Sequence, residues 1–235
     1  MRFFNPINIW ETVALVIVTP PKQRKRVILV ICALILIMGP SQGEQSITYP
    51  YLVSRYSLSS VEYSLFHTYN TLMGTAGTTV AISVFSKYLK MHDSFIGIIG
   101  TASKTVSSIV YGFAPNKQWL FSGPAFDFFA NSAITATRSI GTKVVDPDKV
   151  GKMISLLGLV DSLLPVWNTP IYTKTFAATS KSFPGAVYFL GSIMTGPAFF
   201  VLVTLYILSK RDARDAVKDP AEKEKHAHDN QITAL

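Results

Sequence analysis

The stretch Val27-Ile-Leu-Val-Ile-Cys-Ala-Leu-Ile-Leu-Ile-Met38 is apolar at every position and decides the class of fold. A surface helix of a soluble protein is apolar along one stripe only, whereas a helix surrounded by lipid is apolar all round. A membrane β-barrel needs segments of alternating polarity, and this stretch does not alternate. The stretch therefore predicts a transmembrane helix. It is also short enough for the core of a signal peptide, an alternative that the polar lead of 26 residues disfavours.

Five further apolar stretches follow, each with the roughly 20 residues that a helix needs to cross a hydrocarbon core. The composition agrees, because 49% of the residues are hydrophobic and only 15% are charged. We therefore predict an all-α integral membrane protein with six transmembrane helices. The predicted spans are Val27–Tyr49, Val61–Lys87, Phe95–Ala114, Trp119–Thr142, Val150–Thr173 and Ala186–Leu208.

The positive charges indicate an orientation in the membrane. The net charge is +8. If both ends of the chain and the second and fourth connections lie on one side of the membrane, that side carries sixteen Lys and Arg residues, and the other side carries four. Such asymmetry predicts cytosolic termini and attraction to anionic lipid rather than to nucleic acid. Residues 1–26 form a basic cytosolic segment, 27–209 the bundle, and 210–235 a cytosolic tail too polar to pack, which we predict to be disordered.

Two of the predicted helices contain residues that interrupt helices. The first span holds Gly39-Pro40 followed by the polar run 41–46, and the fifth holds Pro165 and Pro170. Proline removes a backbone hydrogen bond, and a helix break at membrane depth is tolerated only beside protein or a wetted cavity. We predict breaks that line a cavity, with a simple kink as the alternative.

Ionisable residues inside the spans are the candidate functional residues, because an unpaired charge in lipid costs several kcal/mol. Counting about 1.5 Å per residue places Lys104, Asp127 and Asp161 at a similar depth, roughly 15–18 Å from the inner side. A cation and two carboxylates in one layer neutralise each other or hold a proton. We therefore predict a role in substrate binding or proton coupling for this layer.

Two more charges belong to the same set of candidates. Arg138 lies eleven residues beyond Asp127, on the same helix face but about 16 Å away, near the inner mouth. It is placed to steer an anion or, alternatively, to reach lipid headgroups. Glu44 lies toward the outer end of the first span, either at the mouth of a cavity or exposed.

Catalysis is not indicated. The chain has no glycine-rich phosphate loop, no spaced set of metal ligands and no nucleophile with a base, so we predict no metal site and no cofactor. Asp127 and Asp161 keep an intramembrane hydrolase as the weakest alternative. Cys32, the only cysteine, lies in the first span, and His226 and His228 lie in the polar tail.

Several short segments between Asn8 and Arg211 resemble the proton-coupled folate transporter and thymic stromal cotransporter family of the major facilitator superfamily. The similar segments are Glu11-Thr12 to Lys22–Arg26, Phe85-Ser-Lys-Tyr-Leu-Lys-Met-His-Asp93, Ile96-Gly-Ile-Ile-Gly100, Ala133–Arg138, Ile140-Gly141, Gly151-Lys152-Met153, Ile171-Tyr172-Thr173 and Ser182-Phe-Pro-Gly185. The resemblance implies the C-terminal six-helix half of a twelve-helix fold.

The resemblance also implies roles for single residues. Glu44, Asp127, Arg138 and Asp161 would face the central cavity, and Arg138 matches the arginine linked to proton coupling and substrate affinity. Lys104 would be a structural partner. Folate-carrying members place a histidine near the position of Ser41, so folate is not implied here.

The expected function is secondary, proton-coupled transport (symport) of a small organic solute, in the plasma or lysosomal membrane. Since one bundle supplies one wall of a transporter, we expect either a truncated product, or a homodimer or pairing with another transporter half. The alternative function is a non-transporting scaffold or regulatory fragment that associates with full-length transporters.

Overall fold

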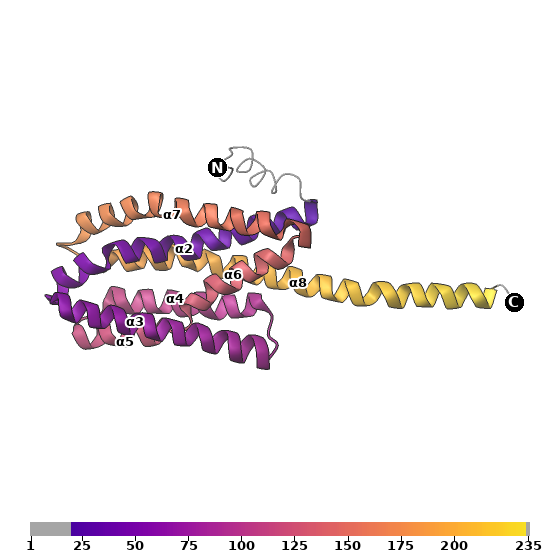
Figure 1. Ribbon diagram of the computed structural model, residues 1–235, viewed down its shortest axis with the longest axis horizontal. Helices are drawn as coiled ribbons and strands as arrows, with labels where there is room; N and C mark the ends of the chain where they lie inside the picture. The colour runs from indigo at the N-terminus through magenta and orange to yellow at the C-terminus, as the bar shows by residue number, and fades with distance from the viewer. Residues whose placement is uncertain (1–19, 234–235) are drawn as a thin grey trace, which may run out of the picture.

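The computed structural model describes the backbone of residues 20–233, and side chains up to residue 214 except 22 and 213. This part of the chain is all-helical, as predicted (Figure 1). Most of the predicted basic segment 1–26 lies outside the described residues. The elements are α2 Pro21–Tyr56, α3 Ser60–Val80, the π-helix η1 Ala81–Tyr88, α4 Asp93–Phe113, α5 Lys117–Phe126, α6 Ala130–Val144, the 3-10 turn η2 Pro147–Lys149, α7 Val150–Thr179 and α8 Ala186–Thr233.

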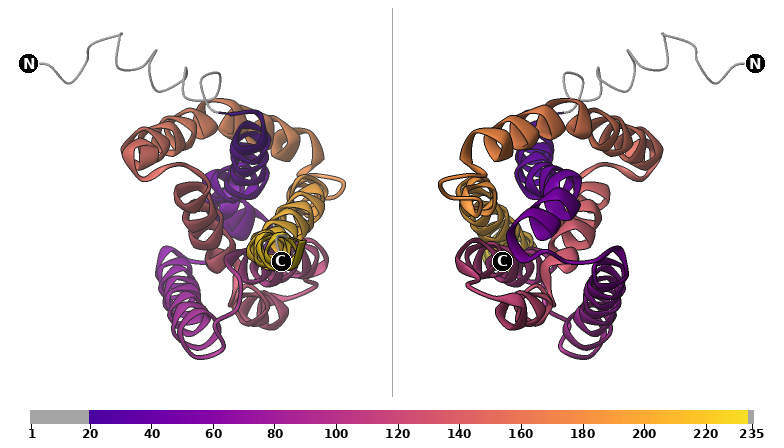
Figure 2. Two further views of the ribbon diagram at one scale, coloured as in Figure 1. Left: turned by 90° about the vertical axis from the view of Figure 1, so that its right-hand side faces the viewer. Right: turned by 90° about the vertical axis from the view of Figure 1, so that its left-hand side faces the viewer.

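The helices run roughly along one axis and form an elongated bundle (Figures 1 and 2). Helix α2 packs against α7, α8 and α6, and α4 packs against α8 and α6. Helix α3 packs against α6 and α5, at the opposite side of the cross-section from α7 (Figure 2). Short connections make sequential helices antiparallel neighbours, so the order of the chain dictates much of this arrangement.

Three helices of the described chain are long and apolar enough to cross a membrane, within Gln23–Tyr56, Pro147–Thr179 and Ala186–Asp212. They correspond to the first, fifth and sixth predicted spans. The other predicted spans are more polar or are divided between two helices. Helix α3 carries a run of threonines, and their hydroxyls donate to carbonyls one turn back on the same helix.

The breaks predicted in the first and fifth spans are wrong, because α2 and α7 run without interruption through their prolines. Polar side chains near the prolines add hydrogen bonds to backbone carbonyls one turn back on the same helix. Ser41 Oγ donates to the Ile37 carbonyl over 3.1 Å, and Asn168 Nδ2 donates to the Leu164 carbonyl over 2.9 Å.

The fourth predicted span is divided instead. Helix α5 ends at Phe126, α6 begins at Ala130, and residues 127–129 form a turn. Pro124 lies three residues before this turn and cannot donate a backbone hydrogen bond. Ser103 of α4 bridges the gap, since its Oγ donates to the Phe126 carbonyl over 2.5 Å and accepts from the Phe129 amide over 3.3 Å.

Glycines let the neighbouring helices approach this turn. A methyl group on Gly77 of α3 would lie 1.7 Å from the Phe128 carbonyl oxygen, and one on Gly100 of α4 would lie 2.6 Å from the Ala133 amide nitrogen. Small residues commonly allow membrane helices to pack closely. The turn is therefore covered by protein on two sides.

Two apolar clusters hold the bundle, and a polar layer separates them along α2. Residues Val27–Ile37 of α2 belong to the first cluster and residues Ile47–Tyr56 to the second. The first cluster joins α2 to α6, α7 and α8, and it is aliphatic. The second is rich in tyrosine, with the ring of Tyr51 5.0 Å from that of Tyr188.

The start of α2 and the end of α8 lie at the same end of the bundle (Figure 1). Arg26 pairs with Asp212 and donates to the Leu208 carbonyl over 3.2 Å. The residues after Ser209, for which the composition predicted disorder, continue α8 to Thr233. At the same end, hydrogen bonds from Lys149 and Gln23 lower the pKa of Asp146.

We expect Gly77→Ala to destabilise the bundle by about 1–3 kcal/mol, because the added methyl meets backbone that cannot move aside. Gly158→Ala in α7 is the matched control, since nothing lies within 4 Å of that position. The control should be neutral or stabilising by up to about 1 kcal/mol through helix propensity. Thermal unfolding in detergent measures both, and equal midpoints would contradict the close approach of Phe128.

Candidate functional site

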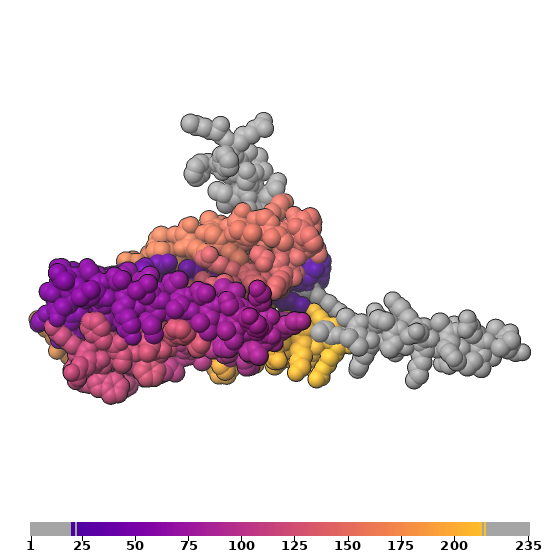
Figure 3. Space-filling view, turned by 60° about the horizontal axis from the view of Figure 1, so that its bottom comes forward, coloured from indigo at the N-terminus to yellow at the C-terminus, as the bar shows by residue number. Residues whose placement is uncertain are grey.

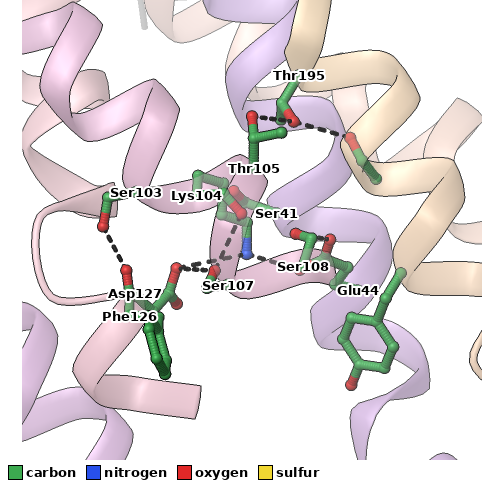
Figure 4. A network of polar contacts seen from close by, with 12 residues as sticks. Ser41, Glu44, Ser103, Lys104, Thr105, Ser107, Ser108, Phe126, Asp127 and Thr195 are labelled. Atoms are coloured by element: carbon green, nitrogen blue, oxygen red, sulfur yellow. Dashed lines mark hydrogen bonds and ion pairs between the residues drawn. The ribbon is translucent and has the colours of Figure 1, made fainter. Parts of the chain in front are cut away.

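A buried ion pair between Glu44 of α2 and Lys104 of α4 forms the centre of the site (Figure 4). The Lys104 Nζ lies 2.6 Å from Glu44 Oε2. Both residues are buried, with 5% of Glu44 and 8% of Lys104 exposed. Such charges remain in a protein interior only when they are paired and hydrogen-bonded. The pair therefore fixes α2 and α4 against each other.

Asp127 extends the pair to a cluster of three charges. Its Oδ1 lies 4.0 Å from Lys104 Nζ. Serine hydroxyls of α4 complete the contacts: Ser108 donates to Glu44 Oε1 over 3.1 Å, and Ser107 donates to Asp127 Oδ1 over 2.7 Å. With both carboxylates ionised, the cluster carries one net negative charge.

The turn between α5 and α6 is what brings Asp127 to this place. Asp127 caps the end of α5, and its amide donates to the Gly123 carbonyl over 3.0 Å. Ser103 holds the turn from α4, one helical turn away from Ser107, which contacts the carboxylate. Interruption of the span thus directs an acidic side chain toward Lys104.

A cavity of about 270 Å³ adjoins the charged cluster. It is bounded by α2, α3, α4 and the start of α6, and its wall is mostly polar. Aromatic rings contribute as well, from Tyr63, Phe66, Tyr111 and Tyr188. The hydroxyl of Tyr111 is buried and has no hydrogen-bond partner among the described residues.

A second ion pair joins Arg138 of α6 to Asp161 of α7. This pair is more accessible, with side-chain exposures of 46% for Arg138 and 21% for Asp161. The sulfur of Met38 on α2 lies 3.6 Å from the Arg138 Nη2. One carboxylate oxygen of Asp161, Oδ1, is buried without a partner in the described chain. Figure 3 shows the face on which α3 and α7 stand apart.

The structure brings the five predicted residues together in two groups, Glu44 with Lys104 and Asp127, and Arg138 with Asp161. Asp127 lies beside Lys104 as predicted, but Asp161 pairs with Arg138 instead, so its predicted part in neutralising Lys104 is wrong. Helix α2 lies between α7 and α4, which separates Asp161 from Lys104 (Figure 2).

Of the two alternatives for Glu44, the exposed position is wrong, because Glu44 is buried; its side chain lines the cavity. The depth of Glu44 was misjudged because α2 continues seven residues past the predicted end of the span, to Tyr56.

Sequence reasoning missed the polar face of α4 that serves the cluster. Lys104, Ser107, Ser108 and Tyr111 are spaced by three and four residues, which places them on one face of a helix. The spacing around a buried lysine is the signal that identifies these residues.

Comparison with protein-family models gives no match. Among curated proteins, the chain is 20% identical to the probable peptidoglycan muropeptide transporter SLC46 of Drosophila melanogaster over 210 residues, which is 87% of this chain and 40% of that protein. It is 26% identical to solute carrier family 46 member 2 of Mus musculus over 147 residues, 62% of this chain and 30% of that protein.

The equivalent protein of Canis lupus familiaris is 25% identical over 142 residues, 59% of this chain and 29% of that protein. The chain thus spans between 29% and 40% of the length of these curated relatives. The relatives are solute carriers rather than enzymes, in agreement with the prediction. Together with the apolar helices, they identify an integral membrane protein.

We expect Lys104→Met to destabilise the bundle by about 3–5 kcal/mol, because it leaves the Glu44 carboxylate buried without its partner. The double variant with Glu44→Gln should recover most of that loss, since no buried charge then remains at the pair. Lys143→Met is the control: its partner is Asp93, at 2.6 Å, but the lysine side chain is 68% exposed. Because the lysine is exposed and Ser139 still donates to Asp93, loss of this pair should cost about 0–1 kcal/mol.

Thermal unfolding of the four proteins in one detergent measures these differences. Equal effects of Lys104→Met and Lys143→Met, or no recovery in the double variant, would contradict a stabilising pair at the centre.

Proposed function

We propose, from the premise that this chain belongs to solute carrier family 46, that it forms one wall of a secondary transporter for a small organic solute. In this proposal the bundle is the C-terminal six-helix half of a major facilitator fold. Protons are coupled to solute movement through the charges at its interior. The single observation that carries the proposal is the Arg138–Asp161 pair, which joins two helices at an accessible position.

Six membrane crossings follow if the polar helices are covered by their neighbours. Helix α4 contains the buried Lys104, but it packs between α6 and α8 and presents its charge to Glu44. The threonines of α3 satisfy their hydroxyls on their own helix. Helices α5 and α6 together form the fourth crossing. Such spans need fewer apolar residues than a helix that faces lipid on all sides.

Arg138 and Asp161 form a pair that a proton and an anionic solute can open in turn. A proton on Asp161 removes its negative charge and releases the guanidinium of Arg138, which then binds a carboxylate or phosphate of the solute in a bidentate manner. Binding of the anion, in turn, favours protonation of Asp161, because linkage is reciprocal. The pair therefore couples proton and solute on the same side of the bundle.

In this mechanism, the cluster of Glu44, Lys104 and Asp127 is a second group of charges inside the bundle. Asp127 is the accessible carboxylate of the cluster, with 17% of its side chain exposed, and it lines the cavity. We assign Asp127 as a second protonatable site, and Glu44 with Lys104 as the buried pair that positions α2 against α4.

In this proposal both termini lie in the cytosol, which the distribution of positive charges supports, and the bundle lies in the plasma or lysosomal membrane. The substrates to screen first are muropeptide-like solutes, because the Drosophila relative is named for a muropeptide. Folates, small peptides and steroid conjugates complete the screen.

We expect proteoliposomes containing the chain to accumulate at least one of these solutes faster when the pH gradient is imposed than when it is collapsed by a protonophore. Arg138→Ala should lower initial uptake by about tenfold or more, since loss of a charged contact costs about 1.5–3 kcal/mol. Arg55→Ala is the control, because Arg55 donates to the Ala114 carbonyl at the far end of α2.

Absence of gradient-driven uptake of every solute, from chain that is folded by size-exclusion chromatography, would contradict transport by the chain alone. The same experiment with added transporter halves or full-length relatives then tests whether a partner supplies the missing wall.

The second candidate is a scaffold that associates with full-length transporters. The observation that favours it is the exposed apolar surface of α7, where Val166 and Trp167 are 61% and 71% exposed. Co-purification with a full-length relative, lost on Trp167→Ser, supports the scaffold if uptake fails in all preparations.

A further inference from the structure

The cavity beside the charged cluster has the chemistry of a cation site. The cluster contributes two carboxylates and one ammonium, so its net charge is −1 when all three groups are ionised. Lys104 is directed to Glu44, and it approaches Asp127 only to 4.0 Å. Within the described residues, the contacts of the Asp127 carboxylate to Ser107 and Lys104 use Oδ1, and the other carboxylate oxygen is left for a ligand.

An independent observation points to a missing partner at the same place. Tyr111 lines the cavity and is only 5% exposed, yet its hydroxyl has no partner among the described residues. Buried hydroxyls without hydrogen bonds are rare in proteins and need an explanation. A ligand that donates to Tyr111 Oη and to Asp127 supplies both missing bonds.

The rest of the wall fits an organic cation better than a metal ion. Tyr63, Phe66 and Tyr188 present aromatic rings, which attract ammonium groups through their faces. Asn70 and Asn131 add neutral amide groups, and His67 is the remaining titratable side chain of the lining. Within the described residues, no group of three His, Cys, Asp or Glu side chains could hold a metal.

We propose that this cavity binds the primary ammonium group of a small organic solute. The ammonium donates to Asp127 and to Tyr111 Oη, while the aromatic rings contact the carbon skeleton. This proposal rests on the proposed transport function, because it treats the cavity as part of the solute's binding site. It adds that the solute carries an amino group. Asp127 then has two proposed roles, because it binds the ammonium group as well as accepting a proton.

The test uses three probes that share a phenyl ring and differ in the head group: phenethylamine, 2-phenylethanol and 3-phenylpropionate. Binding of radiolabelled phenethylamine to the full chain in detergent is measured by equilibrium dialysis, with the other two as competitors. We expect the amine to bind about tenfold more tightly than the alcohol, which corresponds to about 1.4 kcal/mol. The carboxylate should bind most weakly, because the site carries the same sign of charge.

Two variants locate the site. Asp127→Asn should weaken the amine by about tenfold, the usual scale for a charged hydrogen bond, and leave the alcohol within about twofold. Tyr111→Phe should weaken amine and alcohol alike, by about threefold to tenfold. Asp146→Asn is the matched control: it removes a carboxylate at the other end of the bundle, where Lys149 is its partner, and should change neither.

Equal binding of amine and alcohol, tightest binding of the carboxylate, no binding of any probe, or full amine binding by folded Asp127→Asn would each overturn the proposal. If Asp127→Asn does not fold, the three probes on the unaltered chain and Tyr111→Phe decide the matter. Amine binding without gradient-driven uptake keeps the site and contradicts transport by the chain alone. Uptake of anionic solutes without amine binding keeps the transport function and overturns the amine site.

Discussion

The burial of one lysine is the constraint on which the arrangement of this bundle depends. An ammonium group inside a protein surrounded by lipid costs several kcal/mol unless an anion compensates it. Glu44 supplies that anion from α2, so the pair fixes the rotation and height of α2 relative to α4. Helix α8 must then come close as well, since a methyl on Gly191 would lie 2.2 Å from Glu44 Oε1. The polar layer and its two flanking apolar clusters follow from this one contact.

The interruption between α5 and α6 brings a second carboxylate to the same lysine. Asp127 lies at the end of α5, and the turn after it is stable only because Ser103 of α4 satisfies the exposed backbone groups on both sides. Gly77 and Gly100 let α3 and α4 cover the turn. An open backbone at this depth would be unstable without such cover. Helix α4 thus supports Asp127 with one serine and binds its carboxylate with another.

The helical class was predictable from the sequence because a run such as 27–38 has one stable structure in lipid. The candidate charges were predictable for the same reason, since each is expensive where it lies. Their grouping was not, because depth along a helix says nothing about which neighbour a side chain faces. Asp161 has the depth expected of a partner for Lys104, but α2 lies between α7 and α4 (Figure 2). The prolines misled because a proline does not by itself end a helix, and α2 and α7 continue through theirs.

Helix α2 connects the two charged groups, and this gives the bundle a physical route for coupling. Met38 contacts Arg138 on one side of α2, while Glu44, less than two turns further on, holds Lys104 on the other. A rigid helix transmits a shift of one contact to the next, because its packed side chains have few alternative positions. In the mechanism that we propose, opening of the Arg138–Asp161 pair frees the Met38 side of α2, while the cost of moving Glu44 from Lys104 opposes any large displacement. In that mechanism the buried pair limits how far α2 moves, and the accessible pair controls when it moves.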